Sequence, residues 1–415
     1  MTKAKPFIIA RKTVLEAFKL VKANRGSAGT DGITILEYEE NLKDNLYKLW
    51  NRMSSGSYFP PAVLGVEIPK KNGGTRLLGI PTVEDRIAQM TVKLHFEPLV
   101  EPIFYNDSYG YRPNKSAIDA IGVTRQRCWK HNWLIEFDIR GLFDNIDHEL
   151  LMKAVRKHTD CKWVILYIER WLKASLQLPN KEVIRRDKGT PQGGVISPVL
   201  ANLFMHYAFD RWITTSHPGN RWARYADDGI IHCNTEKEAI KLLEQLKLRM
   251  KECNLEIHAD KTKIVYCMDS KRKEKHENIT FDFLGYTFRP RLVGCKNGSM
   301  FVSFTPAVSQ KASKSIRGAI RDWKLQRRVS IEIDELARSI NPIVRGWINY
   351  YGKFCKSELF YALQNVNRAI IQWIKRKYKR FRRRTTLACN WLKQVVKYHR
   401  ELFYHWEVGI LPTAG

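Results

Sequence analysis

The stretch Arg221-Trp-Ala-Arg-Tyr-Ala-Asp-Asp-Gly-Ile-Ile-His-Cys233 places two adjacent acidic residues between two short apolar segments. This pattern predicts a β-hairpin whose tight turn tolerates a positive φ and carries Asp227 and Asp228. Most turns of this composition are simply solvated. The pair therefore becomes informative only together with acidic residues elsewhere in the chain.

A third acidic residue follows another apolar segment. The segment Trp133–Phe143 predicts a strand whose apolar run ends in Asp138, ahead of a glycine-containing turn and a helix that begins near His148. If the two strands are neighbours, Asp138 joins the pair in the hairpin. Carboxylate oxygens suit Mg²⁺, and two such ions about 4 Å apart support phosphoryl or nucleotidyl transfer. Polymerases, nucleases and phosphatases all use this chemistry, so the aspartates define a reaction class only.

The charge balance indicates the kind of partner. Lysine and arginine total 71 against 42 acidic residues, which gives a net charge of +29. Such an excess is typical of proteins that bind nucleic acids. We find no signal peptide, no lipidation motif and no apolar run near the ~18 residues that a membrane span needs. A nucleic-acid partner is therefore favoured over a membrane.

At 415 residues with 44% apolar content, the chain is long enough for two or three domains with cores of their own. Its eight cysteines are scattered, and no two are spaced as C-x-x-C. This spacing argues against structural zinc and against a disulfide framework, and it favours a reducing cytoplasm.

The apolar patterns predict an α+β part first. One helix is expected from Thr34 through Trp50, and a hairpin over Val66–Pro81 with Asn72-Gly73-Gly74 at its tip. After the Asp227 hairpin we expect a helix over Glu236–Cys253 and two strands over 255–258 and 263–267. This order of strands and helices fits a split βαβ palm.

Beyond Pro306 the pattern becomes all helical, and two basic surfaces stand out. In the helix predicted from Ala307 to Gln326, the basic residues recur every three or four positions and so share one face. A single such face is more often only solvated. The acid-free cluster Lys375–Arg384, with Tyr378 and Phe381 between its charges, favours phosphate binding with stacking. The candidate RNA-binding residues are Lys311, Lys314, Arg317, Arg321, Lys375, Arg376 and Lys379.

Seven blocks of sequence, taken in chain order, resemble the group II intron-encoded reverse transcriptases, also called maturases. The resemblance covers about residues 20 to 380. Each block alone is weak or moderate evidence, whereas seven in the order of the family are specific. The blocks are Arg76-Leu-Leu-Gly-Ile-Pro-Thr with Asp85-Arg86 and Gln89; Ser108-Tyr-Gly-Tyr-Arg-Pro; Phe137-Asp-Ile-Arg-Gly-Leu-Phe-Asp-Asn-Ile-Asp-His148; Gly189-Thr-Pro-Gln-Gly-Gly-Val-Ile-Ser-Pro-Val-Leu-Ala-Asn202; Tyr225-Ala-Asp-Asp; Phe283-Leu-Gly-Tyr286; and Asn341-Pro-Ile-Val-Arg-Gly-Trp-Ile-Asn-Tyr-Tyr351.

The resemblance implies an α+β right-hand polymerase fold with an all-helical thumb. Its expected parts are an N-terminal extension (1–60), fingers and palm (61–300), a helical thumb or maturase domain (301–385) and a short C-terminal tail (386–415). The implied activity is RNA-directed DNA synthesis, together with splicing and target-primed mobility of a group II intron. The implied partners are the intron RNA, an RNA template with a DNA primer, and target DNA, in a bacterial cytoplasm and at its nucleoid.

The resemblance also implies roles for individual residues. Asp138, Asp227 and Asp228 would hold two Mg²⁺ ions, and Lys70 and Arg76 would hold the triphosphate of a dNTP. Phe143 occupies the family's steric-gate position, where an aromatic ring excludes a 2′-hydroxyl, although a core phenylalanine is a rival interpretation. Gln192 would touch the nucleotide or the template, and the glycines around it permit close backbone approach.

Other interpretations remain open at this point. A retron or diversity-generating reverse transcriptase is one, but the latter typically has Ser-Gln where this chain has Gln192-Gly193. A splicing factor that lost its polymerase should have lost catalytic aspartates, and a metal-dependent nuclease leaves the fingers hairpin and the thumb unexplained. Because no His-Asn-His endonuclease with paired C-x-x-C motifs follows the thumb, we do not expect this chain to cut the second DNA strand. Monomer and homodimer are equally open.

Overall fold

The structure is a computed structural model that describes residues 6–69, 75–294 and 298–413. The chain divides into two compact units, one formed by residues 1–116 and 135–263 and the other by residues 117–134 and 264–415. We describe each unit separately. The first contains the three aspartates, and the second contains both basic surfaces.

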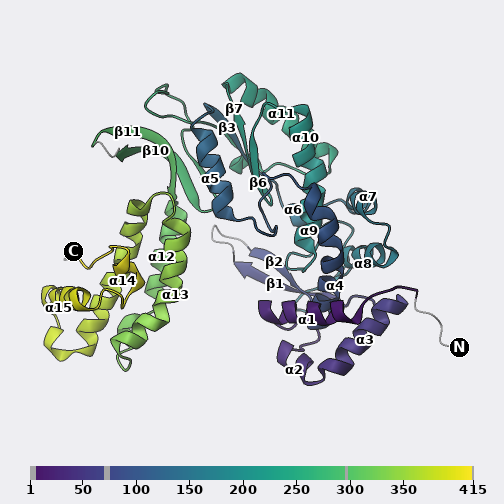
Figure 1. Cartoon of the computed structure of the whole chain (residues 1–415), viewed down its shortest axis with the longest axis horizontal. Coiled ribbons are helices and arrows are strands. Elements are labelled where there is room, and N and C mark those ends of the chain that lie inside the picture. The colour runs from purple at the N-terminus through teal and green to yellow at the C-terminus, as the bar shows by residue number, and fades with distance from the viewer. Residues whose placement is uncertain (1–5, 70–74, 295–297, 414–415) are drawn as a thin grey trace. The chain divides into compact units, whose positions relative to one another are not determined.

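The first unit begins with three helices, of which α1 and α3 pack against α4 and α2 packs against α3 (Figure 1). The predicted helix from Thr34 through Trp50 is in fact two helices, because Asn41 leaves the helical region with φ −116° and ψ 39°. Asparagine does this readily, since its side chain competes for backbone hydrogen bonds. A capping box of Thr34 and Glu37 starts the first of the two. The helices are α1 (Arg11–Asn24), α2 (Ile35–Glu40), α3 (Leu42–Ser55) and α4 (Val83–Val100).

The predicted fingers hairpin is present as two antiparallel strands. β1 (Val63–Pro69) pairs with β2 (Thr75–Ile80) from Leu64 opposite Ile80 to Pro69 opposite Thr75. β1 also pairs in parallel with the short β4 (Leu176–Gln177), which pairs with β5 (Val183–Ile184), so the sheet has the order β2-β1-β4-β5. The expected tip at 72–74 lies outside the described residues.

A second four-stranded sheet has the order β6-β7-β3-β8 and carries the aspartates. Its strands are β3 (Trp133–Asp138), β6 (Trp222–Tyr225), β7 (Asp228–Cys233) and β8 (Lys263–Tyr266). The segment 255–258 was expected to be a strand, which is wrong. Ile257 makes an isolated bridge to Ile139, and the chain then turns as a 3₁₀ helix over Ala259–Lys261.

The remaining helices of this unit pack mainly on one another and on α4, and α11 packs on β7 of the second sheet. The helices that begin at residues 148, 162 and 236 each bury an apolar face. Between α9 and α10 the chain forms one π-helical turn over His206–Asp210, a feature that is frequent near functional sites. These helices are α6 (Leu142–Asn145), α7 (His148–His158), α8 (Lys162–Leu172), α9 (Ser197–Met205), α10 (Arg211–Ser216) and α11 (Glu236–Glu252).

A buried arginine holds the loops around the Asp227 hairpin. Arg224 and Asp210 are both completely buried, and the guanidinium donates to both carboxylate oxygens at 2.7 Å. Its other N–H groups donate to Asn202 Oδ1, to the Ala226 carbonyl and to Ser108 Oγ. All five donors of the guanidinium are thereby used. Removing one partner of such a pair costs about 3–5 kcal/mol.

The second unit combines a helix, a small sheet and a helical bundle. α5 (Ala117–Cys128) packs against β11 (Met300–Val308), which pairs with β10 (Tyr286–Gly294) and through it with β9 (Phe281–Phe283). The helix predicted from Ala307 begins later. Ala307 and Val308 still pair with β10, and Ser309 caps α12 (Gln310–Asp322) by accepting from Ala312 N at 3.1 Å.

The rest of the second unit is helical, as expected. A short tail was expected over residues 386–415, but in the described part of this range, which ends at residue 413, Leu392, Phe403 and Trp406 lie in the buried core of the bundle. His405 is buried there as well, and burial lowers its pKa to about 3. The helices are α13 (Ile333–Tyr351), α14 (Lys356–Lys377), α15 (Thr385–Tyr398) and α16 (Tyr404–Glu407), with 3₁₀ turns over Leu325–Arg327 and Lys379–Phe381.

Two further features concern the described residues as a whole. No helix among them is long and apolar enough to cross a membrane. Seven of the eight cysteines lie in the described part and are free thiols, while Cys295 lies outside it.

Candidate active site

The structure brings the three predicted aspartates to one place. Asp138 is the last residue of β3, Asp228 is the first residue of β7, and β3 and β7 are neighbours in the sheet. Asp227 lies in the turn between β6 and β7, where its carbonyl accepts from Ile139 N at 3.2 Å. The strands therefore bring the carboxylates together as the sequence predicted.

Burial and the repulsion between the carboxylates both disfavour the ionised form of Asp228. Burial is the largest cause, and together with the negative charges of Asp227 and Asp138 and a hydrogen bond with Asp138 it raises the pKa of Asp228 to about 8. A protonated Asp228 can donate that hydrogen bond, whereas an ionised one cannot. The cluster is therefore short of positive charge.

Lys261 supplies part of that charge, and the sequence analysis missed it. Its ammonium donates to Asp138 Oδ2 at 2.8 Å. Burial alone would lower the pKa of Lys261, but the hydrogen bond to Asp138 and the three carboxylates together raise it. Lys261 reaches this place because the 3₁₀ turn that contains it follows the backbone bond from His258 N to the Asp138 carbonyl. The sequence did not predict the contact of Lys261 with Asp138, because Lys261 lies in a short polar segment that has no recognisable pattern.

The donor atoms fit a hard cation. Within residues 6–69, 75–294 and 298–413, no three His, Cys, Asp or Glu side chains form a group already spaced to hold a metal. Asp138 instead binds the ammonium of Lys261, which stands in for a cation at one of its oxygens. Carboxylate oxygens are the ligands that Mg²⁺ takes, and a cation here would relieve the repulsion that raises the pKa of Asp228.

The geometry of the hairpin differs from the predicted one at its glycine. Tyr225 pairs with Asp228, so the turn consists of Ala226 and Asp227, and the positive φ of 57° falls on Ala226. Gly229 is needed for packing instead. A Cβ there would lie 2.1 Å from Phe137 Cζ, so the ring of Phe137 can pass under the hairpin only because this residue is glycine.

A second loop lies against the hairpin backbone. Tyr109 N donates to the Arg224 carbonyl at 2.9 Å, and Asn202 Nδ2 donates to the Gly110 carbonyl at 2.7 Å. A Cβ on Gly110 would lie 2.6 Å from Ala226 N, which is too close for any side chain. The glycine of the Ser108-Tyr-Gly-Tyr segment is thus required because the loop supports the turn that carries Asp227.

Phe143 lies near the hairpin through a chain of rings. It is half-buried in α6, and its ring meets the edge of the Tyr111 ring at 6.2 Å between centroids. Tyr111 in turn lies 6.2 Å from Tyr225, the residue that precedes the turn. Phe143 is therefore not a fully buried core residue, which favours the steric-gate interpretation over the core one.

Gln192 is held between the fingers hairpin and α6. Its carbonyl accepts from Gly79 N at 2.7 Å, and its amide donates to Asp144 Oδ2 at 2.9 Å. A Cβ on Gly193 would lie 2.3 Å from the Gly79 carbonyl oxygen, so the glycine permits this approach. The sequence analysis did not single out Asp144, because the same motif contains other acidic residues and nothing in the sequence distinguishes it from them.

Two predicted triphosphate contacts cannot be placed. Lys70 lies outside the described residues, and Arg76 is described only as a backbone position in β2.

The candidate RNA-binding residues lie in the second unit. On α12 the four basic residues are exposed, while Ala312, Ile316 and Ile320 form the buried face. In the other cluster, Arg376 and Lys379 are exposed and Lys375 donates to Thr385 Oγ1 at 2.7 Å. The expectation that Phe381 stacks on bases is wrong, because this ring is buried and packs against Trp391.

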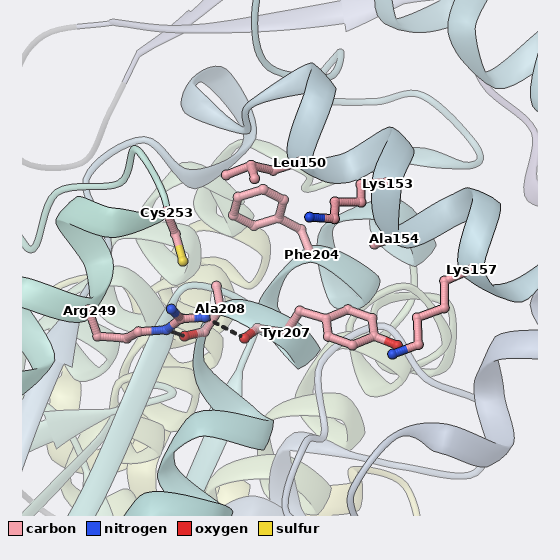
Figure 2. Close-up of a pocket in the computed structure, with 9 residues that line it drawn as sticks. All are labelled: Leu150, Lys153, Ala154, Lys157, Phe204, Tyr207, Ala208, Arg249 and Cys253. Atoms are coloured by element: carbon pink, nitrogen blue, oxygen red, sulfur yellow. Dashed lines mark hydrogen bonds between the residues drawn. The ribbon is translucent and has the colours of Figure 1, made fainter.

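A separate cavity of about 230 Å³ lies between α7, the π-helical turn and α11 (Figure 2). Its arginine, Arg249, is already engaged, because it donates to the Tyr207 and Ala208 carbonyls at 3.0 Å and pairs with Glu252 at 2.9 Å. Arg249 thus links α11 to the π-helical turn. The cavity thus has a structural explanation.

Comparison with known proteins identifies the family. Residues 68–288, more than half of the chain, match the model described as reverse transcriptase (RNA-dependent DNA polymerase). The chain belongs to the reverse transcriptase family. Residues 313–391 match a second model, the group II intron maturase-specific domain. This reverse transcriptase is therefore an RNA-directed DNA polymerase with a part that serves group II intron splicing, and the right-hand polymerase fold with a helical C-terminal part is confirmed.

Individual proteins are similar to this chain over different shares of its length. Protein YkfC of Escherichia coli is 28% identical over 364 residues, which cover 77% of this chain and 90% of YkfC. The group II intron-encoded protein LtrA of Lactococcus lactis is 36% identical over 192 residues, which cover 46% of this chain and 32% of LtrA. A solved telomerase from Candida albicans, in complex with a TWJ fragment of telomeric RNA, aligns over 91% of this chain and 68% of its own at 10% identity, with a TM-score of 0.45.

The repulsion in the carboxylate cluster predicts a stabilising substitution. Between pH 3.8 and about 8 the folded protein holds the Asp228 proton and the unfolded chain does not, so stability falls as pH rises through this window. Asp228→Asn carries no charge and can still donate to Asp138. In a chelating buffer we expect it to unfold at a higher temperature than wild type at pH 8, by about 2–4 °C per kcal/mol gained, and at the same temperature near pH 4.

Differential scanning fluorimetry across this pH range measures the difference. Asp260→Asn, which removes an exposed carboxylate from the same region, is the matched control and should show no such pH dependence. An Asp228→Asn protein that unfolds at the same temperature as wild type at pH 8 would contradict this electrostatic cost at Asp228.

Proposed function

We propose that this reverse transcriptase extends a DNA primer on an RNA template by two-metal nucleotidyl transfer at Asp138, Asp227 and Asp228. The observation that carries the proposal is the convergence of these three carboxylates on neighbouring strands, with a deficit of positive charge between them. Two Mg²⁺ ions bound there would lower the pKa of the attacking primer hydroxyl and neutralise the departing pyrophosphate. Such ions would compete with Lys261 for Asp138.

The surrounding residues are proposed to bind the incoming dNTP. Lys70 and Arg76 on the fingers hairpin hold its triphosphate, since their charges match it. Phe143 lies under the sugar and excludes a 2′-hydroxyl, and its half-buried ring beside Tyr111 supports this role. Gln192 contacts the nucleotide or the template, supported by its rigid attachment to Gly79 and Asp144.

The helical part is proposed to bind the group II intron RNA and so to assist splicing. The exposed basic residues of α12 and of the Lys375–Arg384 cluster support this, because a run of phosphates needs a dispersed positive surface. The same enzyme would then copy the intron RNA from a primer in target DNA, which gives intron mobility. The retention of all three aspartates favours this enzyme over a splicing factor without polymerase activity.

The first prediction tests the metal cluster. Asp227→Ala or Asp138→Ala should abolish Mg²⁺-dependent DNA synthesis on a primed RNA template, because the chemistry depends on one cluster. Affinity for intron RNA should stay within a few-fold, because binding draws on a dispersed surface. Primer extension beside filter binding measures both, with Asp260→Ala as the control. Substantial residual synthesis by Asp227→Ala would refute the assignment.

The second prediction tests sugar selection. Phe143→Ala should raise incorporation of ribonucleotides relative to deoxyribonucleotides, because the ring acts by exclusion and its removal leaves room for the 2′-hydroxyl. Single-nucleotide incorporation with matched dNTP and rNTP gives the ratio. Phe137→Leu, which alters a buried ring beside the same hairpin, is the control for general loss of packing. An unchanged ratio in Phe143→Ala would reduce Phe143 to a packing role.

The third prediction tests the basic face of α12. Reversing the charge of Lys314, Arg317 and Arg321 to Glu should weaken RNA binding and flatten its salt dependence, since each lost phosphate contact removes about one unit from the log–log slope on duplex-like sites. Splicing at low Mg²⁺ should fall more than synthesis on a short primed template, because a structured intron covers more of the basic surface.

A matched control makes the same change of charge elsewhere. Reversal of the exposed α11 residues Lys237, Lys241 and Lys251 should leave the salt slope and splicing close to wild type. If the α12 variant also keeps its slope and its splicing activity, this face is only solvated.

A further inference from the structure

The second unit contains a cavity of about 600 Å³ that no role assigned above uses. It is lined by α5, by the β10–β11 hairpin and by the segment that leads into α14. Trp129, which follows α5, ties two of these parts together because its indole N–H donates to the Phe304 carbonyl at 2.9 Å. We call this cavity the arginine pocket, after the lining residues Arg125, Arg289 and Arg291.

The charges of the arginine pocket are unbalanced. Arg289 and Arg291 both contact the same oxygen of Glu358, at 3.2 and 3.5 Å, and Glu358 is the only acidic residue that lines this cavity in the described part of the chain. Three guanidinium groups therefore face one carboxylate. Two positive charges remain without a counter-charge in the cavity wall.

Two of the arginines also have unused donors. The Nε atoms of Arg125 and Arg291 are buried and have no hydrogen-bond partner among the described residues. Arg291 is only 9% exposed, and Arg289 beside it adds to the effect of burial in lowering its pKa. A buried N–H group without a partner costs free energy, and more so on a charged group. An anion that enters the cavity would remove this cost.

The aromatic residues indicate which kind of anion. The Arg125 guanidinium lies over the Trp129 ring at 4.6 Å and over the Phe354 ring at 5.7 Å. Trp129 is 43% exposed and Phe301, also in the lining, is 42% exposed. Exposed rings beside arginines are the combination that binds unpaired nucleotides, because bases stack on the rings while guanidinium groups hold the phosphates.

The first cavity provides a useful contrast. The Arg249 guanidinium there already donates to two backbone carbonyls and pairs with Glu252, and its Nε has a partner, unlike the Nε atoms of Arg125 and Arg291. In the arginine pocket, the hydroxyl groups of Ser303, Thr305 and Ser357 add donors and acceptors that a base edge can use. The polar groups therefore suit a nucleotide rather than a bare ion.

We propose that the arginine pocket binds an unpaired nucleotide of a nucleic-acid strand, with its phosphate on Arg125 and Arg291 and its base on Trp129. This site is distinct from the polymerase cluster and from the basic face of α12. The site would let the second unit bind single-stranded RNA selectively. A duplex, whose bases are paired, or a surface with positive charge alone would not give this selectivity. The proposal does not depend on polymerase activity.

A cysteine inside the pocket provides the test. Cys355 is a free, half-buried thiol that lines the cavity, and Cys161, equally half-buried in the first unit, serves as an internal control. The full chain is alkylated with N-ethylmaleimide in chelating buffer without dNTP, and modification of each cysteine is followed by peptide mass spectrometry. Oligo(U) RNA should slow modification of Cys355 in a saturable way and leave Cys161 unchanged.

Variants separate local binding from general RNA affinity. Arg125→Gln should weaken the protection of Cys355 about tenfold in RNA concentration, since a hydrogen-bonded charge contact is worth roughly that factor. Arg338→Gln makes the same charge change at an exposed position of α13 and should behave as wild type. Thermal unfolding of each variant shows whether the fold is retained. A folded Arg125→Gln protein with wild-type protection would overturn the proposal.

Three further probes define the ligand. Uridine monophosphate and inorganic phosphate, at the same phosphate concentration as the oligonucleotide, should protect much less, and an abasic oligonucleotide should lose the contribution of stacking. Equal protection by uridine monophosphate would show that the pocket binds free nucleotides. Equal protection by inorganic phosphate would show that it binds anions in general. Either result would overturn the proposal that it binds a nucleotide of a strand. Failure of oligo(U) at saturation would overturn it as well. Because no metal or dNTP is present, none of these outcomes bears on the polymerase assignment.

Discussion

The ion pair between Arg224 and Asp210 is the interaction on which the active-site region depends. Only Tyr225 separates Arg224 from the hairpin turn. The five donors of Arg224 reach the π-helical turn, α9, the Ser108 loop and the hairpin turn itself. A fully buried charge is stable only with such complete pairing. The requirement therefore fixes the position of the turn that carries Asp227, and three separate sequence blocks are held in register by one guanidinium.

Because the contacts of Arg224 fix the hairpin turn, the three carboxylates are held close together and the ionised form of Asp228 is disfavoured. Asp228 cannot move away from Asp138 and Asp227, so burial and repulsion raise its pKa to about 8. Lys261 offsets part of the repulsion through Asp138. This repulsion supports the proposed binding of Mg²⁺ here, because cations between the carboxylates would relieve it.

The second unit shows the opposite use of arginine. Arg224 is saturated within the fold, whereas Arg125 and Arg291 keep buried donors without partners. Natural proteins leave few such groups, and those that persist call for an explanation. The bundle core, which extends through Trp406, is apolar and needs no such charges. The proposed nucleotide site at these arginines and the proposed RNA-binding face of α12 are thus two different surfaces, the first depending on geometry and the second on charge density.

The sequence by itself determined the reaction class, the family and most of the elements. Asp138 and the Asp227 pair were predictable because alternation of apolar residues reveals strands and because acidic turns between them are local features. Lys261, Arg224 with Asp210, and the arginine pocket were not, since each joins residues far apart in the chain through contacts that only folding creates. The same holds for Gly229, which the sequence predicts as a turn residue. The tertiary structure uses it to let Phe137 pass, because a close approach between strands leaves no periodic pattern in a single chain.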